Sequence, residues 1–410
     1  MISSLFNKKT TACPYCYVNL DVNKVAFRCS GRGLPGRPAC RPVTSSRRSK
    51  ILDDKTPVMP SVGPVNVSEG ERLKDKFGDT IDTIAKSEAS CMQCGGSTSV
   101  RICPCCHSLL PFSLDNNSPL FGLIGVRNSG KTVMLSILHK ELLRNVARRF
   151  NAAIDNPGGS SGLARDLDLF EQNMSQEGGR LPAQTAASGA RKKLPAVYEW
   201  KYSRNRKTSA TIFSFYDSAG EDISQQERAL EQQYLGQASG MIMLLDPFSF
   251  PENIMKAKAV GAAVSNADSP ETALDSITYL LQTENRVKRN KKIEVPLAIV
   301  VSKIDAFMDE VPPNHPLRQR GDTGNTFDEL ESQNIHDHMV SLIAHWGGDN
   351  LLRKLEENYK NFRIFGVSAL GAEPDYKSST VNSRGLLPHR VADPLLWLLA
   401  DSGFIPKGKA

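Results

Sequence analysis

The pattern of apolar and polar positions changes at residue 119. After this point, short apolar runs alternate with longer stretches in which apolar residues recur at helical spacing, for example Val133, Ile137 and Leu138. This alternation predicts an α/β fold, a three-layer arrangement with a mostly parallel sheet. The expected strands are residues 120–125, 196–202, 210–216, 241–245, 297–301 and 362–367, and the expected helices are 130–150, 251–283, 326–357 and 391–401.

The residues before 119 show no such alternation, and they contain all nine cysteines. The first twenty residues lack the apolar stretch of a secretory signal, and no apolar run approaches the ~20 residues that span a bilayer. We therefore expect a cytoplasmic protein, in which clustered cysteines are typical of metal sites rather than disulfides. The expected division is a cysteine-rich zinc module at 1–40, a linker at 41–86, a zinc ribbon at 87–112 and an α/β domain at 113–410 in which residues 156–194 are mobile.

Two cysteine pairs near residue 100 have the spacing of a zinc ribbon. Two residues lie between the cysteines of each pair, and eight residues separate the pairs. Four such thiolates can hold a tetrahedral Zn²⁺ at ~2.3 Å from each sulfur, in a segment too small to fold without the metal. The expected ligands are Cys91, Cys94, Cys103 and Cys106, with Cys105 as the odd thiol and His107 as an alternative ligand.

The first cysteine block predicts a second zinc site. Its ligands would be Cys13, Cys16, Cys29 and Cys40, of which only the first two have the short spacing. Ligands exchanged between the two blocks are an alternative, because residues 41–86 are long enough to fold back. Either arrangement leaves no open position on the metal, so the zinc is expected to be structural and to shape a docking surface.

The strongest motif, Gly125–Thr132, is a phosphate-binding loop between an expected strand and an expected helix. In such a loop, backbone N–H groups surround the β-phosphate and the helix N-terminus adds its dipole. Lys131 would neutralise phosphate charge, and the Thr132 hydroxyl would coordinate Mg²⁺. Gly125, Asn128, Ser129 and Gly130 complete the expected contacts.

A second short motif, Asp217–Gly220, follows the strand expected at 210–216. Asp217 could hold Mg²⁺ through a water molecule, and the Gly220 N–H could contact the γ-phosphate. The alternative is an ordinary turn at the end of a strand.

Two further motifs indicate which base is bound. Asp305, with Ser302 and Lys303, follows the strand at 297–301, and its carboxylate could accept two hydrogen bonds from guanine that adenine does not offer. Ser368 and Ala369 follow the last strand, where the Ala369 N–H could reach the guanine oxygen. All these motifs fall at the edge where open α/β sheets bind ligands. Alternatively, Asp305 is a simple helix cap.

With these motifs the chain resembles the TRAFAC-type GTPases over residues 119–402, and so 113–410 is expected to be a P-loop GTPase-like domain. With its cysteine modules it resembles the bacterial double-GTPase group, whose members often carry zinc ribbons before the GTPase domain. The resemblance implies binding of GTP and GDP with Mg²⁺, and slow hydrolysis that switches two loops. It also implies a protein partner, often a second GTPase.

The sequence departs from the usual GTPase pattern at several positions. Ser302 stands where Asn or Thr is usual, and Glu221 stands where many GTPases use glutamine to orient the attacking water. Arg127 could stabilise charge on the γ-phosphate, or it could be an exposed structural arginine. The switch threonine that completes the Mg²⁺ shell is expected before residue 196, and the candidate is Thr185.

The net charge of +7 is less informative than its distribution, because eight basic residues and no acidic residue lie between 24 and 50. The favoured interpretation is that they offset the charge of nearby thiolates, although nucleic acid or anionic lipid could also bind there. The sequence therefore favours a GTP-hydrolysing switch with a partner-docking zinc head. The alternatives are a P-loop ATPase, and a nucleic-acid-binding zinc protein whose P-loop senses nucleotide.

Overall fold

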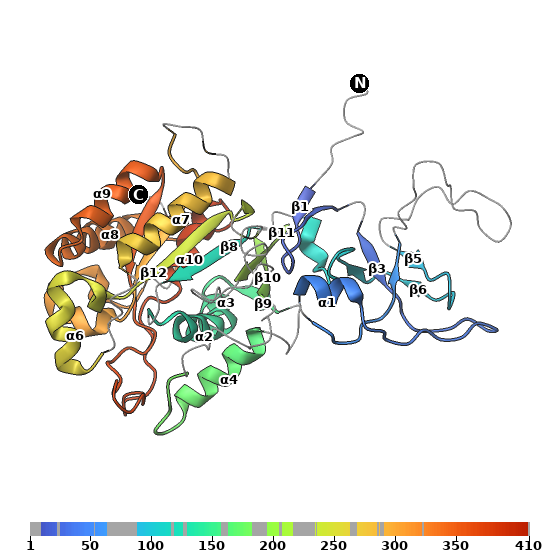
Figure 1. Ribbon diagram of the computed structural model, residues 1–410, viewed down its shortest axis with the longest axis horizontal. Coiled ribbons are helices and arrows are strands. Elements are labelled where there is room, and N and C mark those ends of the chain that lie inside the picture. The colour runs from blue at the N-terminus through green and yellow to red at the C-terminus, as the bar shows by residue number, and fades with distance from the viewer. Residues whose placement is uncertain are drawn as a thin grey trace.

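The computed structural model has two parts, a small N-terminal head and a larger α/β domain, which lie at opposite ends of its long axis (Figure 1). We use "head" for the described residues of 10–115 and "α/β domain" for those of 119–408. The structure describes residues 10–22, 25–52, 54–63, 88–115, 119–125, 129–156, 163–182, 195–204, 207–215, 234, 236–262, 269–284, 287, 291–321 and 324–408.

Four parallel strands form the centre of the α/β domain, in the order β14-β13-β12-β8. Their side chains alternate between two apolar cores, because successive residues of a strand face opposite sides of a sheet. Met241 and Met243 belong to one core, and Ile242 belongs to the other. The strands are β8 (Phe121–Gly125), β12 (Gly240–Leu245), β13 (Leu297–Val301) and β14 (Phe362–Gly366).

Three antiparallel strands, in the order β11-β10-β9, extend the domain beside β8. The rings of Phe121 on β8 and Phe213 on β11 lie 6.3 Å apart between centroids. The sequence predicted two of these strands and missed the third. Their bounds are β9 (Ala152–Asp155), β10 (Ala196–Arg204) and β11 (Lys207–Phe215).

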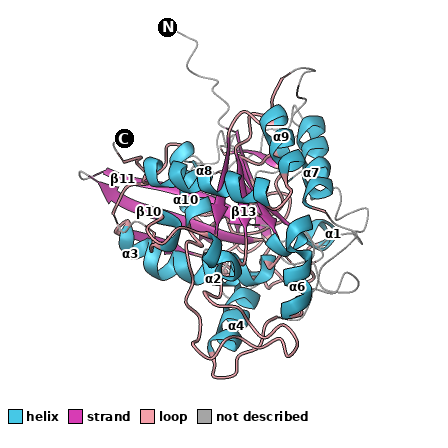
Figure 2. Cartoon of the chain, turned by 90° about the vertical axis from the view of Figure 1, so that its left-hand side faces the viewer, coloured by secondary structure: helices cyan, strands magenta, loops and turns pink. Residues whose placement is uncertain are grey.

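Helices cover both faces of the sheet (Figure 2). Helices α2, α4 and α10 contribute to one core, and α6 to α9 contribute to the other. The bounds are α2 (Lys131–Glu141), α3 (Ala147–Arg149), α4 (Leu163–Ser175), α6 (Ile254–Val260), α7 (Pro270–Glu284), α8 (Glu329–His345), α9 (Asp349–Asn358) and α10 (Asp393–Asp401). A π-helical turn, η2 (Leu142–Val146), joins α2 to α3, and 3₁₀ turns are η1 (Phe112–Asp115), η3 (Pro247–Ser249), η4 (Pro251–Asn253), η5 (Ile304–Glu310) and η6 (Pro316–Arg318).

Helix α4 corrects the expectation that residues 156–194 are mobile throughout. Its apolar residues Leu163, Leu167 and Met174 are buried, and the helix packs against α2. Residues 157–162 and 183–194 lie outside the described residues.

The head contains short strands and one helix, α1 (Ser46–Leu52). Strand β3 pairs with both β4 and β7, so the expected 1–40 module, the 41–86 segment and the 87–112 ribbon share one sheet. The expected linker is therefore folded in part, although 53 and 64–87 lie outside the described residues. The strands are β1 (Thr10–Ala12), β2 (Asn19–Asp21), β3 (Ala26–Arg28), β4 (Ser61–Val62), β5 (Ala89–Ser90), β6 (Ser97–Thr98) and β7 (Arg101–Ile102).

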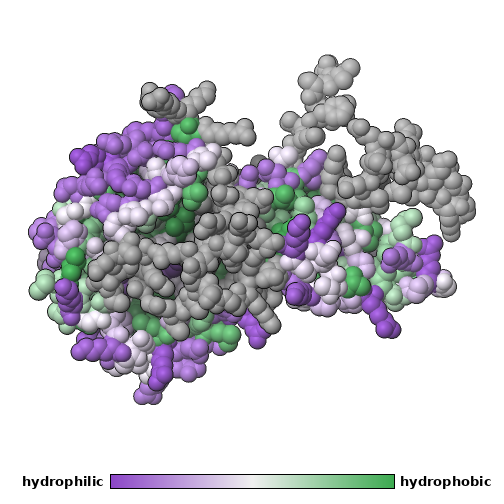
Figure 3. Space-filling view, viewed as in Figure 1, coloured by the Kyte–Doolittle hydropathy of each residue, from purple (hydrophilic) through white to green (hydrophobic). Residues whose placement is uncertain are grey.

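Hydrophilic residues cover much of the described surface of the α/β domain in the view of Figure 3. Among the described residues, no helix combines the length and the apolar character needed to cross a membrane.

Candidate nucleotide site and cysteine clusters

The predicted phosphate loop lies between β8 and α2, as its motif requires. Gly125 ends β8, and Gly130 adopts a left-handed conformation (φ 81°) immediately before α2 begins at Lys131. A Cβ atom on Gly125 would lie 2.6 Å from the Ser129 Oγ, so the two ends of the loop approach too closely for a larger residue. Residues 126–128, which include Arg127 and Asn128, lie outside the described residues.

The start of α2 is suited to an anion. Gly130 precedes the helix without a side-chain cap, and the first N–H groups of a helix lack intrahelical acceptors. Ser129 is 1% exposed, and its hydroxyl has no hydrogen-bond partner among the residues that the structure describes. A phosphate group would satisfy such donors and would interact favourably with the helix dipole.

The predicted base-reading residues lie at the ends of the next two strands. The backbone N–H and the hydroxyl of Ser302 both donate to the Leu245 carbonyl, each at 3.0 Å, and so tie the end of β13 to the end of β12. Lys303 is left-handed (φ 53°) and caps η5. Asp305 therefore does not occupy the cap position that the alternative interpretation assigned to it.

Asp305 and Ser368, which are far apart in the sequence, meet at this edge of the sheet. Burial raises the pKa of the Asp305 carboxyl, while a hydrogen bond with the Ser368 side chain and the charge of Lys303 oppose that rise. The Ser368 Oγ also accepts from the Gly371 N–H at 2.7 Å. Ala369 follows and is half-buried.

Asp246 is a member of this group that the sequence analysis missed. It directly follows the apolar strand β12 and is only 4% exposed. One carboxylate oxygen accepts from the Phe248 N–H at 3.1 Å, and the other lies 2.6 Å from the Lys303 Nζ. The ion pair holds the Lys303 side chain in place beside Asp305. An acidic residue directly after a fully apolar strand was the available signal.

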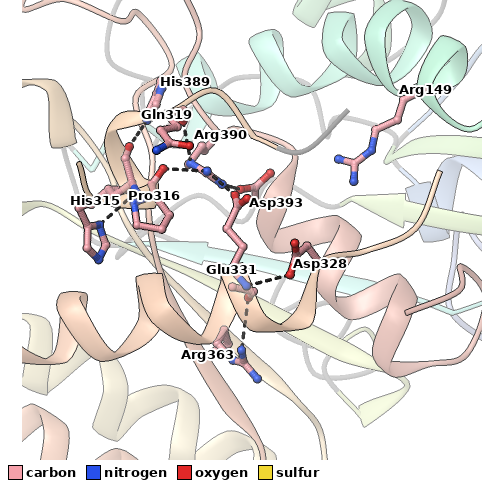
Figure 4. Close-up of polar contacts among 12 residues, drawn as sticks. Arg149, His315, Pro316, Gln319, Asp328, Glu331, Arg363, His389, Arg390 and Asp393 are labelled. Atoms are coloured by element: carbon pink, nitrogen blue, oxygen red, sulfur yellow. Dashed lines mark hydrogen bonds and ion pairs between the residues drawn. The ribbon is translucent and has the colours of Figure 1, made fainter. Parts of the chain in front are cut away.

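A network of ion pairs around Arg390, drawn in Figure 4, lies next to the segment that carries Ser368. The Arg390 side chain is 3% exposed and pairs with Asp393 at 2.7 Å and with Glu331. The neighbouring His389 exchanges two backbone hydrogen bonds with Ser368, so the network fixes the segment that carries Ser368. The adjacent cavity, about 20 Å³, has room for about one water molecule and is not a nucleotide site.

Several predicted residues lie outside the described part of the chain. These are the magnesium and switch candidates Thr185, Asp217 and Gly220, and the hydrolysis candidate Glu221. Their assignments stay predictions, together with those of Arg127 and Asn128.

The eight predicted zinc ligands form two clusters, but the first-choice division between the clusters is wrong. In each cluster the four sulfur atoms lie within 4.8 Å of one another, and each cluster takes ligands from both cysteine blocks. The alternative of exchanged ligands is the one that the structure has, because pairing between β3 and β7 brings the two blocks together. The proximal cluster is Cys13, Cys16, Cys103 and Cys106, and the distal cluster is Cys29, Cys40, Cys91 and Cys94.

The sulfur spacing fits a tetrahedral metal ion. Pairs of sulfur atoms in the two clusters lie 3.5 to 3.8 Å apart. Four ligands at ~2.3 Å from a tetrahedral Zn²⁺ would lie ~3.8 Å from one another. Neither Cys105 nor His107 belongs to a cluster.

Three of the four cysteine pairs form the same tight turn. In each turn the residue after the second cysteine is left-handed, and its N–H donates to the carbonyl of the first cysteine at 2.7 to 2.9 Å. His107 occupies one of these turn positions and lies outside both clusters. The left-handed residues are Tyr17 (φ 60°), Gly95 (φ 72°) and His107 (φ 56°).

Comparisons with known sequences found a family and a relative for this chain. A family model described as "Double-GTPase 2" matches residues 120–355. The "Putative ESX-1 scaffolding and assembly protein SaeC" of Mycolicibacterium smegmatis is 23% identical over 331 residues, which are 75% of this chain and 81% of that protein.

Among solved structures, the chain is similar to the Ski7 GTPase-like domain of S. cerevisiae bound to GTP, with 13% identity and a TM-score of 0.30. It is also similar to sup35 complexed with GMPPNP, with 11% identity and a TM-score of 0.21. The matches cover 62% and 63% of this chain, but only 43% and 38% of those solved chains, so the chain spans less than half of their length.

Proposed function

Because the chain belongs to the double-GTPase 2 family, we propose that it binds GTP and GDP with Mg²⁺ and hydrolyses GTP slowly as a switch. The observation that carries this proposal is that the segments of Asp305 and Ser368 meet at the same sheet edge as the phosphate loop, where the Ile304 N–H donates to the Val367 carbonyl at 3.1 Å. Residues from four parallel strands thus lie where one nucleotide could contact all of them.

The phosphate end binds by charge and by backbone donors. The first turn of α2 and the loop from Gly125 to Gly130 offer N–H groups to the β-phosphate, and Lys131 balances its charge. Thr132 would hold Mg²⁺, with Asp217 and Thr185 as the further expected ligands. Hydrolysis would then depend on a water molecule oriented by Glu221, and Arg127 would stabilise charge on the γ-phosphate.

The residues that follow β13 and β14 would provide the selectivity for the base. The Asp305 carboxylate accepts hydrogen bonds from the N1–H and the exocyclic amine of guanine, whereas adenine offers no matching pair of donors. The Asp246–Lys303 ion pair would keep the lysine stem beside the base, and the Ala369 N–H would donate to the guanine oxygen. These contacts to guanine predict a strong preference for GDP over ADP.

The head would act as a docking module held together by two Zn²⁺ ions. Its cysteines match the spacing of closed thiolate sites, which give structure and no catalysis. The relative named above is described as a scaffolding and assembly protein, which supports a role in recruiting another protein. We infer that the nucleotide state of the α/β domain regulates this recruitment in the cytoplasm.

Competition binding tests the proposed function. With Mg²⁺ present, GDP should displace a fluorescent GDP analogue at least about a hundredfold more effectively than ADP does, as expected for a site that rejects a base lacking two donors. Equal displacement by ADP would instead indicate an ATPase.

Two lysines of the same helix provide a matched control. Lys131→Ala should weaken GDP binding by about a hundredfold or more and abolish GTP hydrolysis, because it removes charged hydrogen bonds to phosphate. Lys140→Ala, whose side chain pairs with Glu171 on α4, should leave binding unchanged. Retained GDP binding by Lys131→Ala would remove the phosphate-loop assignment.

A further inference from the structure

The chain that follows Ser368 and Ala369 folds back at the base end of the site. We call residues 371–387 the base-side loop. The Leu387 N–H donates to the Leu370 carbonyl at 2.9 Å and closes the loop, and Asp375 and Thr380 exchange backbone hydrogen bonds near its tip. A Cβ atom on Gly371 (φ 80°) would lie 1.9 Å from the Leu387 carbonyl oxygen, so the closure requires glycine there.

Tyr376 of this loop packs against the residues that would flank the base. Its ring lies 6.0 Å from the Phe248 ring, nearly perpendicular to it, and the Lys303 Nζ lies 5.9 Å from its centroid. The Tyr376 hydroxyl is buried and has no hydrogen-bond partner in the described part of the structure. The loop therefore contributes an unsatisfied polar group beside Lys303.

Glu373 lies in the loop between Gly371, whose N–H donates to the Ser368 Oγ, and Tyr376, whose ring lies beside Lys303. Burial raises the pKa of the Glu373 carboxyl, and the charge of Asp305 raises it further. One carboxylate oxygen of Glu373 is buried and accepts no hydrogen bond from any residue that the structure describes. Leaving such an acceptor unsatisfied is unfavourable, so a ligand that brings an N–H group would be favoured.

Guanine carries one more donor than Asp305 can use. Its base edge presents the N1–H and two hydrogens on the exocyclic amine, and a single carboxylate pairs with the N1–H and one amine hydrogen. The second amine hydrogen needs another acceptor if it is buried. Glu373 is an unsatisfied acceptor of the right charge in the neighbourhood of Asp305.

We propose that Glu373 is a second base-reading residue, which accepts the exocyclic amine hydrogen of guanine that Asp305 leaves unpaired. Tyr376 is a positioning residue that packs the base-side loop against Phe248 and Lys303. This inference rests on the proposed guanine-nucleotide binding and extends it. It predicts a larger preference for guanine over hypoxanthine, which lacks the amine, than Asp305 alone would give.

A purely structural role for the Glu373 side chain would give a different result. The loop contact that Glu373 makes is through its backbone carbonyl, which accepts from the Asn382 side chain at 3.2 Å. Substitution of the side chain leaves that contact intact. Glu373→Gln should therefore fold normally, and its thermal unfolding provides the check.

The test measures the affinities of GDP and inosine diphosphate for the full-length protein with Mg²⁺, by displacement of a fluorescent GDP analogue. Wild type should prefer GDP. Glu373→Gln should weaken GDP binding about tenfold and leave inosine diphosphate binding unchanged, because only guanine carries the amine. Lys377→Gln, an exposed change on the same loop, should alter neither affinity.

The outcomes separate this inference from the proposed function. If wild type prefers GDP to ADP but Glu373→Gln keeps the wild-type ratio of GDP to inosine diphosphate affinity, the role of Glu373 is overturned and guanine binding stands. If wild type shows no preference for GDP over ADP, both fail. Glu373→Asp is the second variant. Its shorter side chain draws the carboxylate away from the base, so it should also lower the ratio of GDP to inosine diphosphate affinity.

Discussion

The proximal and distal clusters each contain four cysteines but lie in different surroundings. The proximal cysteines are at most 2% exposed and share an apolar core with Val197 and Ile212 of the α/β domain. Around the distal cluster, the buried residues other than cysteine are Phe27 and Val62 of the head, and Cys40 is half-buried. The proximal cluster is thus part of the junction between the two regions, whereas the distal cluster lies within the head.

The contacts of the proximal cluster also lead toward the strand that precedes the phosphate loop. Tyr17, in the turn that carries two proximal ligands, lies 4.7 Å from Tyr234 between ring centroids. The Tyr234 hydroxyl donates to the carbonyl of Phe121, the first residue of the strand that leads to the phosphate loop. Two similar cysteine clusters can therefore have unequal roles, one in joining the head to the domain and one in shaping the head alone.

The largest expected effect comes from removing one ligand of each cluster. Cys16→Ser should lower the free energy of unfolding of the whole chain by several kcal/mol, because metal binding and folding are coupled and the cluster packs on the α/β domain. Cys29→Ser should release the distal metal and leave the unfolding of the α/β domain unchanged. Metal analysis and thermal unfolding measure both effects, and equal destabilisation by the two variants would contradict the comparison.

Tyr17→Ala should remove most of the apolar contact between the proximal turn and Tyr234. Loss of a buried aromatic side chain costs about 3–5 kcal/mol. Tyr17→Phe keeps the ring and should cost much less. Denaturant unfolding measures the difference, and two variants of equal stability would show that the ring contact contributes little.

Arg48 and Arg47, which are adjacent in the sequence, test whether a buried contact at the proximal cluster contributes more to stability than an exposed one. The Arg48 side chain is buried, pairs with Asp54 at 2.6 Å and donates to the Cys106 carbonyl, so Arg48→Ala should cost about 2–3 kcal/mol. Arg47→Ala, which removes one exposed hydrogen bond to Pro104, should stay within about 0.5 kcal/mol. Similar losses for both variants in thermal unfolding would argue against a buried anchor at Arg48.

An effect smaller than that of Arg48 should come from Glu199, which receives hydrogen bonds from Ser113 and pairs with Lys201. Burial opposes ionisation of Glu199, but these hydrogen bonds prevail and hold its pKa below the ordinary 4.5. A lowered pKa stabilises the fold at pH values above the ordinary pKa of the unfolded chain. This stabilisation is lost as the pH falls through the lowered pKa of the folded state. Glu199→Gln should therefore cost about 1 kcal/mol at neutral pH and less at acid pH, as measured by urea unfolding at both pH values.

The strands of the α/β domain were predictable because their signals are local. The apolar runs at 241–245 and 297–301 are strands β12 and β13, since fully buried parallel strands need nothing beyond their own residues to be recognised. Helix α4 was missed because glycine, alanine and serine on either side obscured the helical spacing of Leu163 and Leu167.

The division of the cysteines between two metal sites could not be read from the sequence, because it depends on pairing between β3 and β7. The same reason applies to Glu373. It lies beyond the motif that contains Ser368, and only the closed base-side loop brings it near Asp305. Spacing along the chain identifies ligands and motifs, whereas their grouping depends on the fold.

The central claim is that Asp305 selects guanine, and one exchange of base specificity tests it most directly. GDP and xanthosine diphosphate would compete with a fluorescent GDP analogue on wild type, and with a fluorescent xanthine analogue on Asp305→Asn. The asparagine amide can donate to the xanthine oxygen where the carboxylate accepted from the guanine amine, so the preference should reverse from GDP to xanthosine diphosphate. If Asp305→Asn binds GDP as wild type does, Asp305 does not read the base, and the guanine-nucleotide account is contradicted.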